Sequence, residues 1–436
     1  MHYRRGRQFA ITVLLAMTGC SDSLLNVDNP DVIQPGGLQG EVGAAALFEG
    51  ARAEFISGHD GDPNNLGLVY VSGLFSDEFI FPATPPSLIE MDRRAIQPEN
   101  GSNGDIFLAL HRARISAERA LTALGALTTS ASDSRIGEAG AISAMVYNLF
   151  GETFCSGAPF SSVVDGNIIP GNSMSTQQMF EEALTRLNAA AAKTAGDPDV
   201  TNLVRVQRGR VLINLGRFPE AAAAVSAVPT GFQFENPHST ADARTQNAIK
   251  GLMWDTFFLG MGDTEGTNGL DYVSAGDPRV SSVDGGVSEF DLQTQVFRFV
   301  GYESSDSPVP LATGAEARLI QAEAALRAND VNGWLARLNE PRAAKGMAPL
   351  LDPGTAASRV DLTFRERAFW LYGTAHRLGD LRRLIKQYDR GAESVFPTGD
   401  YHKDNLQRAN QVALVVPQTE ENNPNYSPSA CDPTKP

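Results

Sequence analysis

Residues 208–229 read RGRVLINLGRFPEAAAAVSAVP, and this stretch decides the fold class. Gly216 interrupts two runs that are otherwise suited to helices, and it predicts a tight turn between them. Gly209 permits close approach of a neighbouring helix, and Ala221 lets the second helix nest on the first. Phe218 packs between the two. The stretch therefore predicts a helical hairpin.

A second stretch of this kind covers residues 316–338, EARLIQAEAALRANDVNGWLARL. Its first helix is expected to end at Asn329-Asp330. The buried positions are Leu319, Ala322, Ala324 and Leu326 before this break, and Trp334, Leu335 and Leu338 after it. The first stretch, with Leu212, matches the small and large positions of a tetratricopeptide helix pair, and the second stretch offers another helix pair. Such hairpins cannot bury their faces singly, so we predict a mainly α fold in which they stack as a scaffold.

Amphipathic patterns predict further helices over residues 105–124, 136–149, 175–191 and 363–384. Two of these begin with a capping box, in which the side chains at the helix start bond each other's backbone. The pairs are Ser175 with Gln178, and Thr363 with Glu366. The last helix has weak points at Gly373 and Gly379.

Proline and glycine are concentrated in residues 229–312 and 391–436, which predicts long loops there. We expect one domain over residues 20–436. Its helical scaffold lies mainly within 41–228 and 313–390. The loop-rich insertion then covers 229–312, and an irregular tail covers 391–436.

The amino terminus has the pattern of a secretory leader over residues 1–19. Basic residues precede the apolar run Phe9–Met17, which is too short to span a bilayer. Met17-Thr18-Gly19-Cys20 resembles a lipobox, so Cys20 is the predicted lipidation site. The alternative is an ordinary leader with a cysteine near its cleavage site by chance. Acyl chains on Cys20 would anchor the protein to a membrane without a transmembrane helix.

Two further cysteines, Cys155 and Cys431, remain after processing. An exported chain meets an oxidising compartment, where two thiols can pair. We consider a disulfide between them and two free thiols as alternatives, because the sequence does not show their proximity.

The chain has a formal net charge of −15, which excludes nucleic acid as a partner because phosphate binding needs clustered lysine and arginine. A neutral or cationic ligand fits better, although acidity also keeps proteins soluble.

The sequence contains no HExxH pair, nucleophile elbow or phosphate loop. We therefore predict no catalytic residue, no cofactor and no metal, and a protein that is not an enzyme. His59, Asp60 and Asp62 are interpreted as a turn, because no glutamate follows at the spacing of a calcium loop. A glycan hydrolase remains a weaker alternative, since any two carboxylates brought together could act as acid and base.

Aromatic residues in the loop-rich insertion are the candidate ligand surface. Aromatic rings stack on the apolar faces of sugars, while amides and carboxylates bind the hydroxyls. The candidates are Trp254, Phe257, Phe258, Tyr272 and Tyr302, together with Asn268 and Asp271. The alternative for each ring is a core residue beneath the loops.

Charged motifs near the end of the chain resemble a family signature. Glu366-Arg367, His376-Arg377 and Asp380-Leu381-Arg382-Arg383 are similar to the carboxy-terminal signature of SusD/RagB proteins. Two positions that are usually acidic in that signature are Trp370 and Thr374 here. Other segments resemble the same family in the same order: residues 25–30 (LNVDNP), 76–78 (SDE), 277–279 (DPR) and 316–324 (EARLIQAEA).

This resemblance implies a SusD-like fold whose loop-rich half binds the ligand. It also implies a lipoprotein of the Gram-negative outer membrane that faces the cell surface. Such a protein binds a nutrient, usually an oligosaccharide and in some relatives a peptide, and delivers it to a TonB-dependent receptor of the SusC type. The alternative is a tetratricopeptide-like interaction lipoprotein that docks a protein partner and binds no small ligand.

Overall fold

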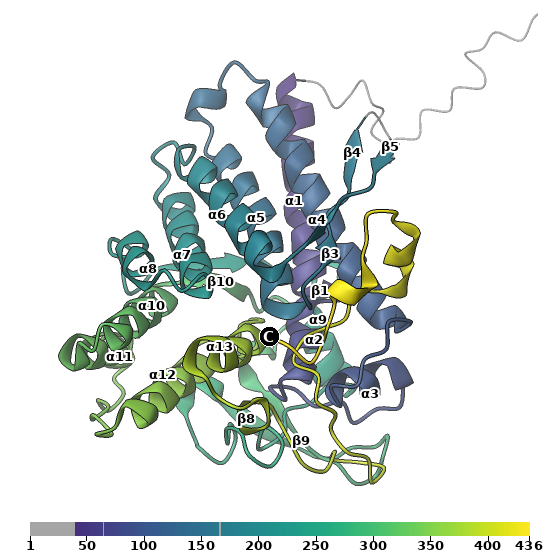
Figure 1. The fold of residues 1–436 in the computed structure, drawn as a ribbon, viewed down its shortest axis with the longest axis vertical. Helices are drawn as coiled ribbons and strands as arrows, with labels where there is room; N and C mark the ends of the chain where they lie inside the picture. The colour runs from purple at the N-terminus through teal and green to yellow at the C-terminus, as the bar shows by residue number, and fades with distance from the viewer. Residues whose placement is uncertain (1–39, 64, 165–166) are drawn as a thin grey trace, which may run out of the picture.

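The computed structural model describes residues 40–63, 65–164 and 167–436. Helices dominate this part of the chain, as predicted (Figure 1). The α-helices are α1 (Gly40–His59), α2 (Leu68–Phe75), α3 (Pro86–Asp92), α4 (Gly101–Gly125), α5 (Arg135–Thr153), α6 (Thr176–Ala191), α7 (Pro198–Asn214), α8 (Phe218–Ala224), α9 (Ala248–Lys250), α10 (Gly314–Arg327), α11 (Val331–Ala344), α12 (Ala356–Trp370), α13 (Arg377–Tyr388) and α14 (Ala392–Val395).

The strands found among these residues form two-stranded antiparallel sheets. The pairs are β1 (Gly61–Asp62) with β2 (Asn65–Leu66), β3 (Ala158–Pro159) with β6 (Ser173–Met174), β4 (Ser162–Val164) with β5 (Asn167–Ile169), β7 (Gln233–Asn236) with β10 (Val309–Thr313), and β8 (Ser282–Val287) with β9 (Gln295–Phe299). Their registers include Val309 opposite Asn236 and Ser282 opposite Phe299.

The helices stack in chain order, which confirms the predicted scaffold. Helix α1 packs on α4, α4 on α5, α5 on α6, and α6 on α7. The hairpin of α7 and α8 then meets α10, which pairs with α11. Figure 1 shows α1, α4, α5 and α6 side by side, with α10 to α13 extending below them. One large hydrophobic core runs through the stack, and a smaller one lies under the α10–α11 hairpin.

The α7–α8 hairpin has the local features that its sequence predicts. Gly216 adopts a positive φ of 72° in the turn between the helices. A Cβ atom added at Gly209 would lie 2.5 Å from Cγ1 of Val225, so only glycine allows this helix approach. Phe218 and Ala221 are buried. In the second hairpin, the Asp330 carboxylate caps α11 by accepting from the Gly333 N–H at 2.9 Å.

The capping box at Ser175 and Gln178 is present, but the one predicted at Thr363 and Glu366 is wrong. Helix α12 begins earlier, where the Thr355 hydroxyl accepts from the Ser358 N–H at 3.1 Å. Thr363 lies inside α12, and its hydroxyl donates to the Arg359 carbonyl at 2.7 Å.

The single helix predicted over residues 363–384 is in fact two helices. It breaks after Trp370, where Gly373 and Ala375 take positive φ values of 66° and 62°. Gly379 lies within α13 and does not interrupt it.

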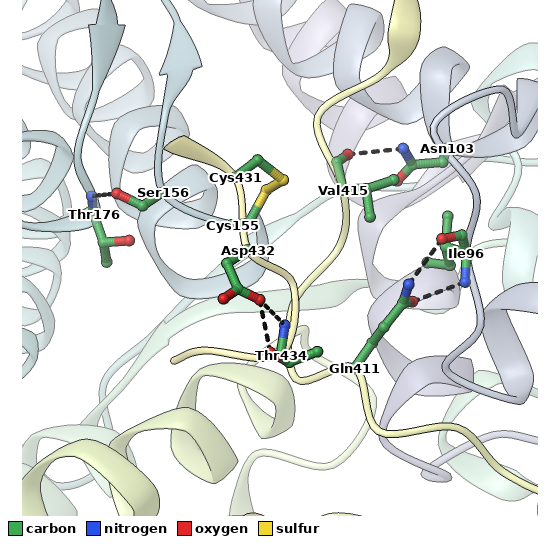
Figure 2. The surroundings of a disulfide bond; sticks show 10 residues. All are labelled: Ile96, Asn103, Cys155, Ser156, Thr176, Gln411, Val415, Cys431, Asp432 and Thr434. Atoms are coloured by element: carbon green, nitrogen blue, oxygen red, sulfur yellow. Dashed lines mark hydrogen bonds between the residues drawn. A yellow bond between two sulfur atoms is a disulfide. The ribbon is translucent and has the colours of Figure 1, made fainter. Parts of the chain in front are cut away.

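The tail returns to the scaffold and is bonded to it. Cys155 and Cys431 form a disulfide, one of the two alternatives the sequence left open (Figure 2). Gln411 bonds the backbone of Ile96 twice, and the Asn103 amide donates to the Val415 carbonyl at 2.9 Å. The tail therefore covers the ends of α4 and α5. Cys20 lies outside the described residues.

Candidate functional site

The loop-rich insertion places aromatic rings at the surface. Phe258 and Phe290 are 37% and 38% exposed, and their ring centroids lie 4.9 Å apart. Leu292, in the same loop as Phe290, is 79% exposed. Large apolar side chains exposed together in this way indicate a binding surface, because burying them against a ligand is favourable.

The loop that carries Phe290 is held by Asp291. Its carboxylate accepts from the backbone N–H groups of Gln293 and Thr294 at 3.1 and 3.0 Å, which fixes a tight turn. Leu292 takes a positive φ of 57° within that turn. The ring is thus presented by a defined loop rather than by a regular strand.

Arg298 of β9 arranges two of the predicted rings. Its guanidinium lies 4.2 Å from the Phe257 ring centroid and 5.8 Å from that of Trp254. The indole N–H of Trp254 donates to the Phe299 carbonyl at 3.2 Å. Both rings are half-buried, so part of each remains exposed to solvent. Both residues precede the exposed Phe258 closely in the sequence. We call Trp254, Phe257, Phe258, Phe290 and Arg298 the loop face.

A polar pocket of about 360 Å³ begins in the same loop as Phe290. We call it the tail pocket, and its lining residues are Gln293, Asp400, Tyr401, His402, Lys403, Asp404, Asn405 and Gln407. Its volume lies at the lower end of the range for small-ligand sites. Amides and carboxylates on its walls are suited to sugar hydroxyls, which both donate and accept hydrogen bonds.

Lys403 fixes one wall of the tail pocket by bonding to the backbone, so its ammonium is already engaged within the protein. The Lys403 ammonium donates to the carbonyls of Phe81 and Ala83, in the loop after α2. Burial lowers the pKa of Lys403, and burial also lowers the pKa of His402 to about 4, so the imidazole is neutral at pH 7. The exposed charges of the pocket are therefore the carboxylates of Asp400 and Asp404.

Two predicted ligand residues are core residues, which corrects the prediction. Tyr272 is 1% exposed and its hydroxyl donates to Glu265 at 2.7 Å. Tyr302 is 3% exposed and its hydroxyl donates to the Gly373 carbonyl at 2.8 Å. Neither ring presents a surface to a ligand, because Tyr272 packs against Phe369 of α12 and Tyr302 packs against Phe299 and reaches the turn after α12.

The other two predicted polar residues bind parts of the protein itself. The Asn268 amide donates to the carbonyls of Glu393 and Phe396 at 3.1 and 3.0 Å. Asp271 forms an ion pair with Arg365 at 2.9 Å, and this hydrogen bond lowers the pKa of Asp271. The structure thus brings Trp254 and Phe257 to one surface and uses Asn268 and Asp271 as ties to the tail and to α12.

Sequence reasoning missed Phe290 and the tail pocket. Phe290 stands in the glycine-containing stretch 285–292, GGVSEFDL, and an apolar residue in such a loop was an available signal. The tail pocket gave only a polar, turn-rich pattern. It could not be predicted because its walls come from two segments, Gln293 and residues 400–407, which are more than 100 residues apart in the chain.

The turn predicted at His59, Asp60 and Asp62 is found only at Asp60, which is buried, because His59 is the last residue of α1 and Asp62 lies in β1. The Asp60 carboxylate lies 2.5 Å from Nδ1 of His59 and accepts from the Asn236 amide at 2.8 Å. Nε2 of His238 lies 3.1 Å away. Burial opposes ionisation, yet the two histidines hold the pKa of Asp60 below its usual value. Asp60 therefore ties the end of α1 to β7.

Across the residues that the structure describes, no group of three His, Cys, Asp or Glu side chains is arranged to hold a metal ion.

No protein-family model matches the chain, and no curated protein is significantly similar to it. Solved structures do match. A SusD superfamily protein from Parabacteroides distasonis aligns with a TM-score of 0.66 over 88% of this chain and 98% of its own, at 12% identity. A SusD-like carbohydrate binding protein from Bacteroides vulgatus gives a TM-score of 0.61 over 88% and 96%, at 14% identity. Surface glycan-binding protein A from Bacteroides uniformis gives 0.61 over 88% and 99%, at 13% identity.

The chain has the SusD fold. The resemblance drawn from its motifs is thereby confirmed at the level of structure, although sequence identity is low.

In this SusD-fold chain, the signature residues form a buried ion network rather than a ligand site. Arg377 makes two hydrogen bonds to Glu265, both at 2.6 Å. Asp380 accepts from Arg367 at 2.7 Å and from Arg383 at 2.8 Å. These pairs join α13 to α12 and to the insertion.

The earlier motifs complete this network of the SusD fold. Arg279 of the DPR segment bonds both oxygens of Glu366, at 2.6 and 3.1 Å. Asp77 of the SDE segment pairs with Arg408 at 2.5 Å and accepts from the Gly266 N–H at 2.7 Å. The motifs are far apart in sequence, and their shared role is to bond the insertion and the tail to the helices.

Proposed function

We propose that the chain captures an oligosaccharide at the cell surface and delivers it to a TonB-dependent outer-membrane receptor of the SusC type. The observation that carries the proposal is the exposed Phe258–Phe290 pair, whose loop also lines the tail pocket. Rings for stacking and polar groups for hydroxyls are the two elements of a sugar site. The names of two structural neighbours, a carbohydrate binding protein and a surface glycan-binding protein, support this ligand class.

The proposed role is binding without turnover. Most charged residues of the signature form ion pairs inside the protein, as Arg377 with Glu265 shows, and Arg382 donates to the Gly151 carbonyl. The part of the ligand that enters the tail pocket is a neutral or amine-bearing sugar, since the exposed charges of that pocket are the carboxylates of Asp400 and Asp404.

Membrane attachment is proposed at Cys20, with the described part of the protein held at the cell surface. Across the described residues, no helix is both long enough and apolar enough to cross a bilayer. Lipid chains on Cys20 would supply stable anchoring. Mass spectrometry of the mature amino terminus tests this, because an unmodified Cys20 would contradict it.

The alternative role, docking a protein partner, has one observation of its own. A groove of about 480 Å³ lies along α7 and α8 and contains Arg205 and Arg208. Such a groove suits an acidic segment of a partner. Under this alternative, the loop face binds no small ligand.

Affinity gel electrophoresis against a panel of neutral polysaccharides tests the proposed function. We expect the wild-type protein to be retarded by at least one of them. The double variant Phe258→Ala/Phe290→Ala should bind about tenfold more weakly or worse, because two stacking rings are lost. Leu351→Ala, at an exposed apolar residue outside the loop face, is the matched control and should bind normally. If no polysaccharide retards the wild type, or if the double variant migrates like it, the loop face is not a glycan site.

A further inference from the structure

A second cleft lies between the α10–α11 hairpin, the β7–β10 sheet and the turn that joins α12 to α13. Its volume is about 300 Å³, and none of its lining residues belongs to the loop face or the tail pocket. Gln233, Pro310, Pro341, Lys345, Trp370 and Leu371 are among its walls. An enclosure of this size with mixed apolar and polar walls fits a small ligand.

Trp370 forms a fixed wall of this cleft. Its indole N–H donates to Glu366 at 3.2 Å, and the buried Arg279 guanidinium lies 5.1 Å from its ring centroid. The ring is half-buried, so part of it remains in contact with the cleft. Thr374 also lines the cleft, beside Trp370.

Lys345 supplies an exposed positive charge at the same place. Its ammonium lies 5.7 Å from the Trp370 ring centroid and makes no ion pair within the ranges that the structure describes. It is carried just beyond the end of α11, so its flexible side chain is free to move over the ring.

The surroundings of Lys345 are basic, although the chain as a whole has a net charge of −15. Arg318 and Arg337 share one carboxylate, Glu340. Arg279 and Arg342 share Glu366, and Arg279 also pairs with Asp277. Of the residues that line the cleft, Lys345 and Glu316 carry a charge. The buried Glu316 is paired with Arg210 at 2.8 Å, which leaves Lys345 as the exposed charge of the cleft. Coulombic attraction therefore favours an anionic ligand here, in contrast to the tail pocket with Asp400 and Asp404.

We propose that this cleft is a second saccharide site, specific for a carboxylate-bearing sugar. The Trp370 ring stacks on the apolar face of the sugar, and the Lys345 ammonium pairs with its carboxylate. The Gln233 amide, which is exposed on the sheet, bonds a hydroxyl. The protein would then bind neutral and acidic parts of a glycan at two separate places.

Tryptophan fluorescence tests the proposal, because the chain has only three tryptophans. In a Trp254→Phe background, the remaining ones are Trp370 and the fully buried Trp334, so a ligand signal comes from Trp370. Titration with digalacturonate should give a saturable change that weakens as salt is added. The neutral disaccharide cellobiose should give none.

Lys345→Met in the same background is the deciding variant, since an exposed lysine can be replaced without disturbing the fold. We expect it to weaken digalacturonate binding about tenfold, corresponding to about 1.4 kcal/mol. Lys193→Met, at an exposed lysine of another helix end, is the matched control and should bind as the parent does.

Three results would each overturn the proposal. These are no saturable change up to the solubility limit of digalacturonate, equal binding of cellobiose, or unchanged affinity in Lys345→Met. Tighter binding of a peptide with a free carboxyl terminus would assign the cleft to peptides instead. The gel assay above reports on Phe258 and Phe290, so failure of this proposal and failure of the proposed function are distinguishable.

Discussion

Several charged side chains inside this protein are paired with opposite charges at contact distance. Asp380 sits between Arg367 and Arg383, and Glu316 pairs with Arg210 and lies 3.2 Å from Nε2 of His376. Burial acts against the ionised form, yet Arg210 and His376 hold the pKa of Glu316 at about 2. A buried charge is tolerated only when such partners replace water. These residues therefore fix the relative positions of helices, and removing one partner would leave the other charge uncompensated.

Glu78 differs from these residues, because it is buried without an ion-pair partner among the described residues. It is 1% exposed, and one carboxylate oxygen accepts from the Gly373 N–H at 3.3 Å. The other oxygen has no hydrogen-bond partner among the described residues. Burial raises the pKa of Glu78 to about 8, so the group is protonated in the folded protein at neutral pH.

Glu78→Gln should remove a pH-dependent loss of stability. Because the folded pKa lies above the unfolded value of 4.5, the stability linked to Glu78 is complete below that value and is lost as pH rises through about 8. Glutamine keeps the shape and has no proton to lose. We expect the variant to gain stability over the wild type between pH 5 and 8, at roughly 1.4 kcal/mol per unit of pKa shift as an upper bound.

Denaturant unfolding at pH 5 and pH 8 measures this difference. Asp77 and Asp92 also have pKa values raised by burial to about 6, so the comparison is between variant and wild type at each pH. Glu99→Gln, at an exposed glutamate, should show no such difference. A Glu78→Gln gain that is the same at both pH values would contradict the assignment.

At the scale of elements, the corner between α12 and α13 is where the motifs meet. Gly373 takes a φ of 66°, and its carbonyl accepts from the Tyr302 hydroxyl. The neighbouring Tyr372 hydroxyl donates to the Glu78 carbonyl. This corner therefore joins the scaffold to the insertion and to the segment after α2.

Gly373→Ala should destabilise the protein by about 1–2 kcal/mol. Alanine is strained at this φ, and its Cβ would lie 3.2 Å from Cε2 of Tyr302. Differential scanning fluorimetry should show a melting temperature lower by several degrees. Gly391→Ala is the control, since Gly391 has a φ of −67° and its Cβ would meet nothing closer than 3.7 Å. Equal melting temperatures for the two variants would show that the corner tolerates a side chain.

The whole molecule is closed by its tail. The disulfide joins residues separated by 276 positions. The attachment continues in two backbone hydrogen bonds of Leu414, whose carbonyl accepts from Cys155 and whose N–H donates to the Thr153 carbonyl. Since the tail also carries most of the tail pocket, its docking shapes a candidate ligand site at a distance from the disulfide.

Replacing both cysteines with alanine should lower the free energy of unfolding by about 2–4 kcal/mol, because the unfolded chain is no longer restrained across a long loop. Limited proteolysis should then cut within residues 391–436 earlier than in the wild type. Wild-type protein treated with reductant should behave like the double variant. If the variant and the wild type are cut at the same rate, the hydrogen bonds alone hold the tail.

Sequence alone was enough to predict the helical hairpins and their stacking. The features concerned are local: the turn at Gly216, the small residue at Gly209 and the cap at Ser175 act within a few residues of where they stand. Gly373 was predicted as a weak point of one helix, but a complete break there was not predicted. Its backbone conformation depends on Tyr302 and Glu78, which come from distant segments.

Tertiary structure alone decided which aromatic residues of the insertion reach the surface. Tyr272 and Tyr302 are buried because Glu265 and the Gly373 carbonyl accept their hydroxyl protons inside the protein. The rings of Phe258 and Phe290 have no polar group that needs a hydrogen-bond partner, and they pack against each other at the surface. Burial depends on what the rest of the chain packs against each ring, and composition and periodicity along one segment do not contain that information.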